Sequence, residues 1–161
     1  MIKINLDNDL LSIFDNEQKL EINNKINFLI EKCINIEGLN DKNIYVSIQS
    51  VSKSQIKNLN KEYRKIDKET DVLSFPVFEK DEIKQIKDKE IKINEIELGD
   101  ILICLDIIKI HAEEYNTGIK RELIYMIIHG ILHLLGYDHI YEEEKIIMRT
   151  KEKELLSLGG F

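Results

Sequence analysis

The sequence contains few of the residues and patterns that mark secreted, fibrous or membrane-spanning proteins. Its 161 residues include no tryptophan, one proline and only two cysteines, Cys33 and Cys104. Because these cysteines lie in apolar surroundings with no paired spacing, we expect a reduced, cytoplasmic protein without disulfides. No segment at the start resembles a secretory leader. The longest apolar stretch, residues 124–135, is interrupted by two histidines and a glycine and is too short to cross a bilayer, so we expect no membrane association.

An excess of basic residues is also absent. The chain has 30 acidic and 23 basic residues, which gives a net charge of −7. This balance argues against a histone-like or general nucleic-acid binder, although it allows a local basic patch. Hydrophobic residues make up 43% and charged residues 33%, which is typical of a globular protein. The length predicts one domain over residues 1–161 with its own hydrophobic core.

Hydrophobic periodicity predicts an α+β fold, a single layer-type domain with a small mixed sheet of about four strands and about five helices. Alternating patterns predict strands over residues 2–6, 44–48, 71–75 and 98–104. Capping pairs at Asp15 and Ser52 open two helices, and the other three are expected over 106–115, 119–135 and 142–158. The charged stretch 79–97 is predicted to be a solvated loop or hairpin insertion.

Three of the four histidines lie within eleven residues. His129 and His133 are four residues apart on a predicted helix, so their imidazoles leave the same face within about 6 Å of each other. Gly136 permits a left-handed turn that reverses the chain and returns His139 towards them. Three converging imidazoles suit one Zn²⁺ ion and leave its fourth position open, which is typical of catalytic zinc. The alternative is that these are ordinary core or helix-surface histidines, as we expect for His111.

The spacing H-x-x-x-H-x-x-G-x-x-H is shared with the metzincin proteases. Those enzymes carry a glutamate directly after the first histidine as the general base. This sequence has Gly130 there, and a glycine accepts no proton. The downstream methionine turn is missing as well, because Met148 falls within a predicted helix. The metzincin-like metalloprotease is therefore the least favoured of the candidate functions.

Three stretches of the chain resemble the YbeY endoribonucleases, which are also called rRNA maturation factors. HGILHLLGYDH at 129–139 resembles the zinc signature of that family. NKEYRKIDKETDVLSFP at 60–76 matches its pattern N-x-x-x-R-x-x-D-x-x-T-D-V-L-S-F-P at every specified position. LGDILIC at 98–104 is similar to the strand that follows the variable loop of the family. The resemblance extends over roughly residues 44–158.

This resemblance implies a zinc-dependent, single-strand-specific endoribonuclease that acts in 16S rRNA 3′-end maturation and ribosome quality control. By position, it implies that His129, His133 and His139 are the zinc ligands and that Arg64 faces the metal cleft. The expected partners are single-stranded rRNA and the small ribosomal subunit or its proteins.

The residues themselves leave several roles open. The planar guanidinium of Arg64 suits bidentate binding of the scissile phosphate. The alternatives are an exposed helix arginine or a salt bridge to Asp67. Asp138 either orients an imidazole or caps the following helix. No residue stands out as the general base, so a non-catalytic ribosome-assembly factor with a structural zinc is the second candidate function.

Overall fold

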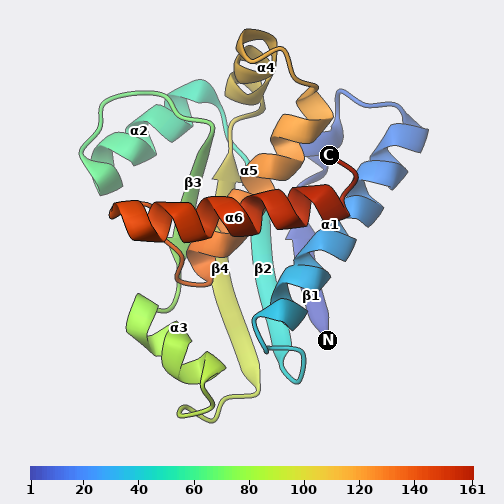
Figure 1. Ribbon diagram of the computed structural model, residues 1–161. Coiled ribbons are helices and arrows are strands. Elements are labelled where there is room, and N and C mark those ends of the chain that lie inside the picture. The colour runs from blue at the N-terminus through green and yellow to red at the C-terminus, as the bar shows by residue number, and fades with distance from the viewer.

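Four strands form one mixed sheet in the order β1-β2-β4-β3 (Figure 1). The computed structural model describes residues 1–161. Strands β1 (Ile2–Leu6), β2 (Asn43–Ser50) and β4 (Glu95–Ile103) run parallel to one another. Strand β3 (Val72–Pro76) closes one edge by pairing antiparallel with β4. The predicted α+β class and the predicted four-stranded mixed sheet are confirmed.

Six α-helices and one short 3₁₀ turn, η1 (Asn8–Leu11), surround this sheet. The helices are α1 (Asn16–Ile36), α2 (Lys53–Arg64), α3 (Lys80–Lys87), α4 (Leu105–Glu114), α5 (Ile119–Leu134) and α6 (Glu142–Leu158). Helix α5 contacts β3 and β4 on one side and α1 and α6 on the other, so it lies between the sheet and the outer helices (Figure 1). The parallel connection from β1 to β2 needs a crossover, and α1 provides it.

Helix α5 occupies the centre of the hydrophobic core. Most of its side chains are buried, which explains why its sequence is apolar nearly all round. It lies so close to the sheet that a Cβ atom added to Gly130 would be 2.8 Å from the Cδ1 atom of Ile101 on β4. No helix of the protein is both long and apolar enough to cross a membrane.

The charged stretch 79–97 differs from the prediction of a solvated loop or hairpin. Residues Lys80–Lys87 form α3, and β4 begins at Glu95 rather than at Leu98. Glu79 and Glu82 form a capping box at the start of this helix, while Ile83 and Ile86 are buried against the core. These two isoleucines, three residues apart, pack the helix on the core, although charged side chains cover its other faces. It accounts for the sixth helix, where about five were expected.

Candidate metal centre

The structure brings the three predicted histidines together. His129 and His133 project from successive turns of α5, and His139 lies in the loop between α5 and α6. One ligand nitrogen from each lies within 4.8 Å of the others, and the Nε2 atoms of His129 and His133 are 3.0 Å apart. Two nitrogens on a tetrahedral zinc, with bonds of 2.0–2.1 Å, are about 3.3 Å apart. The distance between His129 and His133 is close to this value, and three imidazoles within 4.8 Å of one another could hold one divalent ion.

Hydrogen bonds at the far nitrogens orient two of these imidazoles. The Nδ1 atom of His129 lies 2.6 Å from the Oε1 atom of Glu152, and the Nδ1 atom of His133 lies 2.9 Å from the carbonyl oxygen of Tyr137. Because both partners are acceptors, Nδ1 donates in each ring and the Nε2 lone pair is directed towards the other histidines. A ligating histidine is usually held in this way by a partner on its second nitrogen.

Glu152 on α6 is the functional residue that sequence reasoning missed. Its side chain is only 5% exposed, and its Oε2 atom accepts a hydrogen bond of 3.0 Å from the hydroxyl of Tyr125. The sequence does contain a signal, because Met148, Glu152 and Leu155 follow helical spacing and all three are buried. A glutamate in the apolar stripe of a helix needs a buried partner.

Asp138 has neither of the two roles that the sequence left open. Its Oδ1 atom accepts a hydrogen bond of 2.7 Å from the backbone N–H of the neighbouring His139. The residue that precedes α6 is Tyr141, and no side chain caps that helix. Asp138 therefore stabilises the local conformation of the loop that carries His139, while Glu152 orients an imidazole.

Burial keeps His133 in the form that binds metals. Removal from water, and then the neighbouring imidazoles of His129 and His139, lower the pKa of His133 to about 4. At neutral pH this imidazole is uncharged, so its Nε2 lone pair is available without loss of a proton.

Two glycines shape the segment that carries the three histidines. Gly136 has φ +92°, and the backbone N–H of Tyr137 donates to the carbonyl of Leu132, so the predicted left-handed turn after α5 is present. Gly130 lies against Ile101, as described above, and a side chain at this position would collide with β4. Metzincins carry their general base at this position, but here the close packing of α5 on the sheet requires a glycine.

Arg64 ends α2, and its side chain is exposed. The alternative of a salt bridge to Asp67 is wrong, because Asp67 pairs with Lys61 at 3.4 Å. Buried Asn60, one turn before Arg64, donates from Nδ2 to the carbonyl of Lys68 at 2.9 Å and so orders the loop that follows α2. That Arg64 faces the metal cleft stays a prediction.

Comparison with known proteins agrees with the motifs. The family model described as "Endoribonuclease YbeY" matches residues 12–159. The chain belongs to the YbeY endoribonuclease family. It is 42% identical over 154 residues to the endoribonuclease YbeY of Finegoldia magna, with 94% of each chain covered. It is 40% identical over 151 residues to that of Caldicellulosiruptor bescii, with 92% of this chain and 96% of the relative covered.

A solved structure has a similar fold. The solution structure of a Thermotoga maritima protein matches this YbeY-family chain with a TM-score of 0.57 and 30% identity. The match covers 99% of this chain and 89% of the other. The resemblance that the motifs indicated is thus supported over almost the whole length of the chain, including the first forty residues, where no motif was evident.

Proposed function

We propose that this protein is a zinc-dependent, single-strand-specific endoribonuclease that acts in 16S rRNA 3′-end maturation and ribosome quality control in the cytoplasm. The observation that carries the proposal is the convergence of His129, His133 and His139, with both α5 imidazoles already oriented. The relatives are named endoribonucleases, which supports RNA as the substrate.

Each of the site residues has a distinct task in this proposal. His129, His133 and His139 hold one Zn²⁺ ion, which when bound supplies Lewis acidity towards a phosphodiester. Glu152 keeps the imidazole of His129 in place through its Nδ1 atom. Arg64 binds the non-bridging oxygens of the scissile phosphate through its planar guanidinium and offsets their negative charge.

The charge distribution favours a substrate that is delivered by a partner. Exposed basic side chains gather on α2 and in the loop that follows it, at Lys57, Lys61, Arg64, Lys65 and Lys68. The chain as a whole has a net charge of −7. A small basic patch on an acidic protein binds an RNA backbone weakly and with strong salt dependence. The small ribosomal subunit or its proteins would then bring the single-stranded rRNA to the site.

One observation favours the second candidate, a non-catalytic ribosome-assembly factor with a structural zinc. Both carboxylate oxygens of Glu152 accept hydrogen bonds, one from His129 and one from Tyr125. The buried carboxylate nearest to the histidines is thus committed to orienting them and is not a free general base. The two candidates differ in whether the histidine ligands are needed for RNA cleavage or only for metal binding.

The deciding experiment follows cleavage of an end-labelled single-stranded RNA that spans the 3′ end of 16S rRNA, beside the same RNA in a duplex. Zinc-loaded protein is compared with chelator-treated protein, His133→Ala, and His111→Ala as a histidine outside the cluster. We expect cleavage of the single strand by the loaded protein and by His111→Ala only. Equal cleavage by His133→Ala, with folding confirmed by circular dichroism, would indicate a contaminating ribonuclease and contradict the proposal.

If zinc binds stoichiometrically but no preparation cleaves the RNA, the assembly factor becomes the better interpretation. Co-sedimentation of the zinc-loaded protein with small ribosomal subunits then tests that second candidate directly.

A further inference from the structure

Tyr137 connects the metal centre to a second polar cluster. Its carbonyl oxygen accepts the hydrogen bond from Nδ1 of His133, and two residues later the chain reaches His139. Its hydroxyl donates to the carboxylate of Glu37 at the end of α1, with distances of 2.8 and 3.0 Å to the two oxygens. The backbone of this residue thus holds one predicted ligand, while its side chain is anchored on a different helix.

Two lysines complete the anchor. The Nζ atom of Lys87, from α3, lies 2.7 Å from the Glu37 carboxylate, and that of Lys151, from α6, lies 2.9 Å from it. Both ammonium groups also lie over the ring of Tyr137, 4.9 and 5.0 Å from its centroid. The side chain of Glu37 is 6% exposed, so its charge is shielded from water and compensated by both cations.

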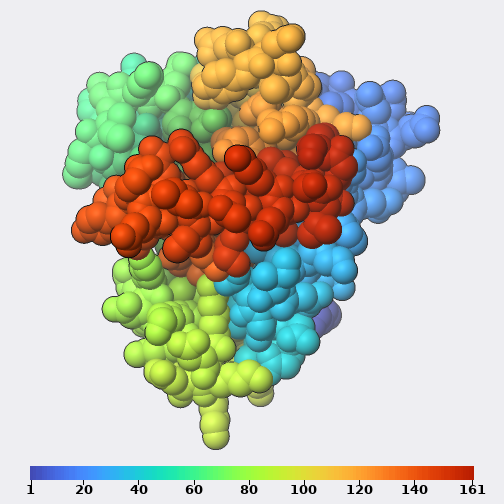
Figure 2. Space-filling model, viewed as in Figure 1, coloured from blue at the N-terminus to red at the C-terminus, as the bar shows by residue number.

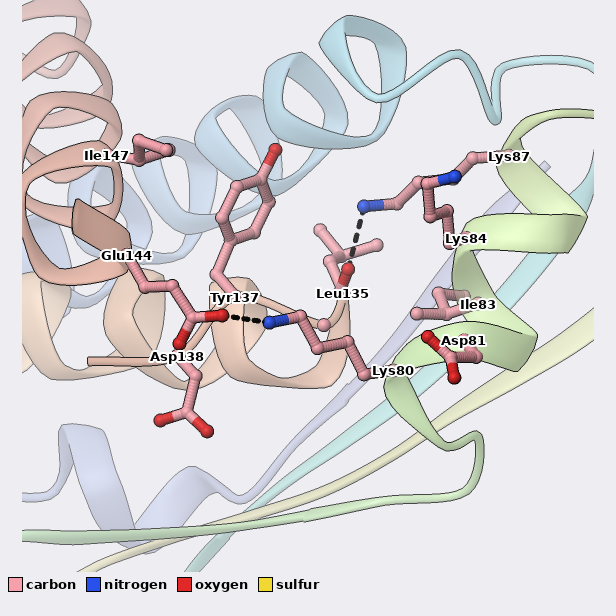
Figure 3. A pocket seen from close by; sticks show the side chains of 11 residues that line it. Lys80, Asp81, Ile83, Lys84, Lys87, Leu135, Tyr137, Asp138, Glu144 and Ile147 are labelled. Carbon is pink, nitrogen blue, oxygen red and sulfur yellow. Dashed lines mark hydrogen bonds and ion pairs between the residues drawn. The ribbon is translucent and has the colours of Figure 1, made fainter. Parts of the chain in front are cut away.

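Helix α3 also touches the loop directly. Lys87 donates a second hydrogen bond of 2.7 Å to the carbonyl of Leu135, which Figure 3 shows beside Tyr137. A Cβ atom added to Gly136 would lie 2.8 Å from Ile83 of α3. At the other end of the helix, Lys80 pairs with Glu144 of α6 (Figure 3). The pocket between these elements, about 290 Å³, is bounded by α3, the loop and α6, and Figure 2 shows α3 directly below the N-terminal part of α6.

We propose that Glu37, Lys87, Tyr137 and Lys151 form a loop clamp that positions His133 and His139 for metal binding. Helix α3 is therefore a positioning element of the metal centre, through Lys87, rather than a surface insertion. The clamp ties α1, α3 and α6 to the five residues 135–139, so the entropy of ordering the ligand loop is lost on folding and not on metal binding. This inference rests on the metal site of the proposed function.

The test compares two lysines on the same helix. Lys87→Met removes one cation of the clamp and the bond to Leu135. Lys84→Met removes a lysine one turn away that is 75% exposed and pairs only with Asp88. Zn²⁺ affinity is measured by competition with a chromogenic chelator, and Co²⁺ absorption reports the ligand geometry. We expect roughly tenfold weaker Zn²⁺ binding and a weaker Co²⁺ band for Lys87→Met, the lower end of the range for residues that hydrogen-bond to metal ligands, because Lys87 acts through the loop. We expect wild-type values for Lys84→Met.

Two further variants separate positioning from a general loss of folding. Tyr137→Phe removes only the hydroxyl that reaches Glu37, and it should weaken Zn²⁺ binding in the same direction, while circular dichroism of the metal-free protein should show that it remains folded at the assay temperature. Lys87→Arg keeps the charge and should restore most of the affinity. If Lys87→Met and Tyr137→Phe bind Zn²⁺ as tightly as Lys84→Met and the wild-type protein do, the clamp is overturned while the metal site stays intact. Failure of the wild-type protein to bind Zn²⁺ would instead overturn the metal site, and the clamp with it.

Discussion

The two motif segments of this protein differ in how firmly they hold their candidate site residues. In the segment 129–139, two imidazoles have fixed partners, Glu152 and the Tyr137 carbonyl, and the turn between His133 and His139 packs against α3. In the segment 60–76, the backbone after α2 is ordered by Asn60, but the side chain of Arg64 is exposed and forms no ion pair with Asp67. A metal site benefits from ligands that are positioned in advance, whereas a phosphate-binding arginine needs its donors free for the substrate.

The largest expected effect tests the free arginine. Arg64→Ala should lower the rate of RNA cleavage by roughly 100-fold, because a charge-stabilising donor for the phosphate is lost, and it should leave Zn²⁺ affinity unchanged. Arg64→Lys keeps the charge but loses the bidentate geometry, so it should also cleave more slowly than the wild type. Cleavage rates and chelator competition on the same preparations check both statements. Unchanged cleavage by Arg64→Lys would remove the phosphate-binding role.

The second prediction concerns the hydrogen bond that holds His129. Glu152→Gln keeps the shape of the side chain but weakens the acceptor for His129, so Zn²⁺ affinity should fall by about 10- to 100-fold. Cleavage at saturating Zn²⁺ should fall less than the affinity does. Glu154→Gln, an exposed neighbour on α6, is the matched control and should behave as the wild type. A loss of cleavage in Glu152→Gln without any loss of Zn²⁺ affinity would contradict a role for Glu152 in orienting His129, because Glu152 would then act on the substrate.

The close packing of α5 on the sheet should contribute to the free energy of unfolding. Gly130→Ala places a methyl group against Ile101, and we expect the free energy of unfolding to fall by about 1–3 kcal/mol. Gly118→Ala is the control, since nothing lies within 4 Å of its added Cβ and the residue precedes α5 with an ordinary φ. Urea denaturation of the metal-free proteins measures both. A neutral Gly130→Ala would show that Ile101 moves aside without cost.

The last effect concerns pH. Burial alone would raise the pKa of Glu37, but hydrogen bonds from Lys87 and Lys151 outweigh it, so the pKa is lowered from its usual 4.5. A lowered pKa means that the stabilising contribution is present above about pH 4.5 and is lost as the pH falls through the folded-state pKa. At pH 7 we expect Glu37→Gln to lower the free energy of unfolding by roughly 2 kcal/mol. Denaturation of the wild type and of Glu37→Gln between pH 3 and 7 should show that this difference in stability decreases at the acid end. A difference that stays constant would disprove that ionised Glu37 stabilises the protein.

The clustering of the three histidines could be predicted because the residues that cause it are close together in the chain. His129 and His133 are one helical turn apart, so their rings leave the same face of the helix. Gly136 has a positive φ, which other residues rarely adopt, and the glycine in the sequence therefore predicts the turn that returns His139. The four strands and five of the helices were likewise predicted from periodicity. Helix α3 was not, because its charged residues outweigh the two buried isoleucines that attach it.

By itself, the sequence determined the α+β class, the three histidines of the candidate metal centre and the family resemblance, since each depends on residues close together in the chain. Only the tertiary structure decided what supports that centre. Glu152 lies 23 residues from His129, and Glu37 lies 100 residues from Tyr137, yet both pairs are in hydrogen-bond contact. Such pairs form because helices α1, α3 and α6 pack around α5 and its loop, and no local periodicity encodes which buried charge meets which partner.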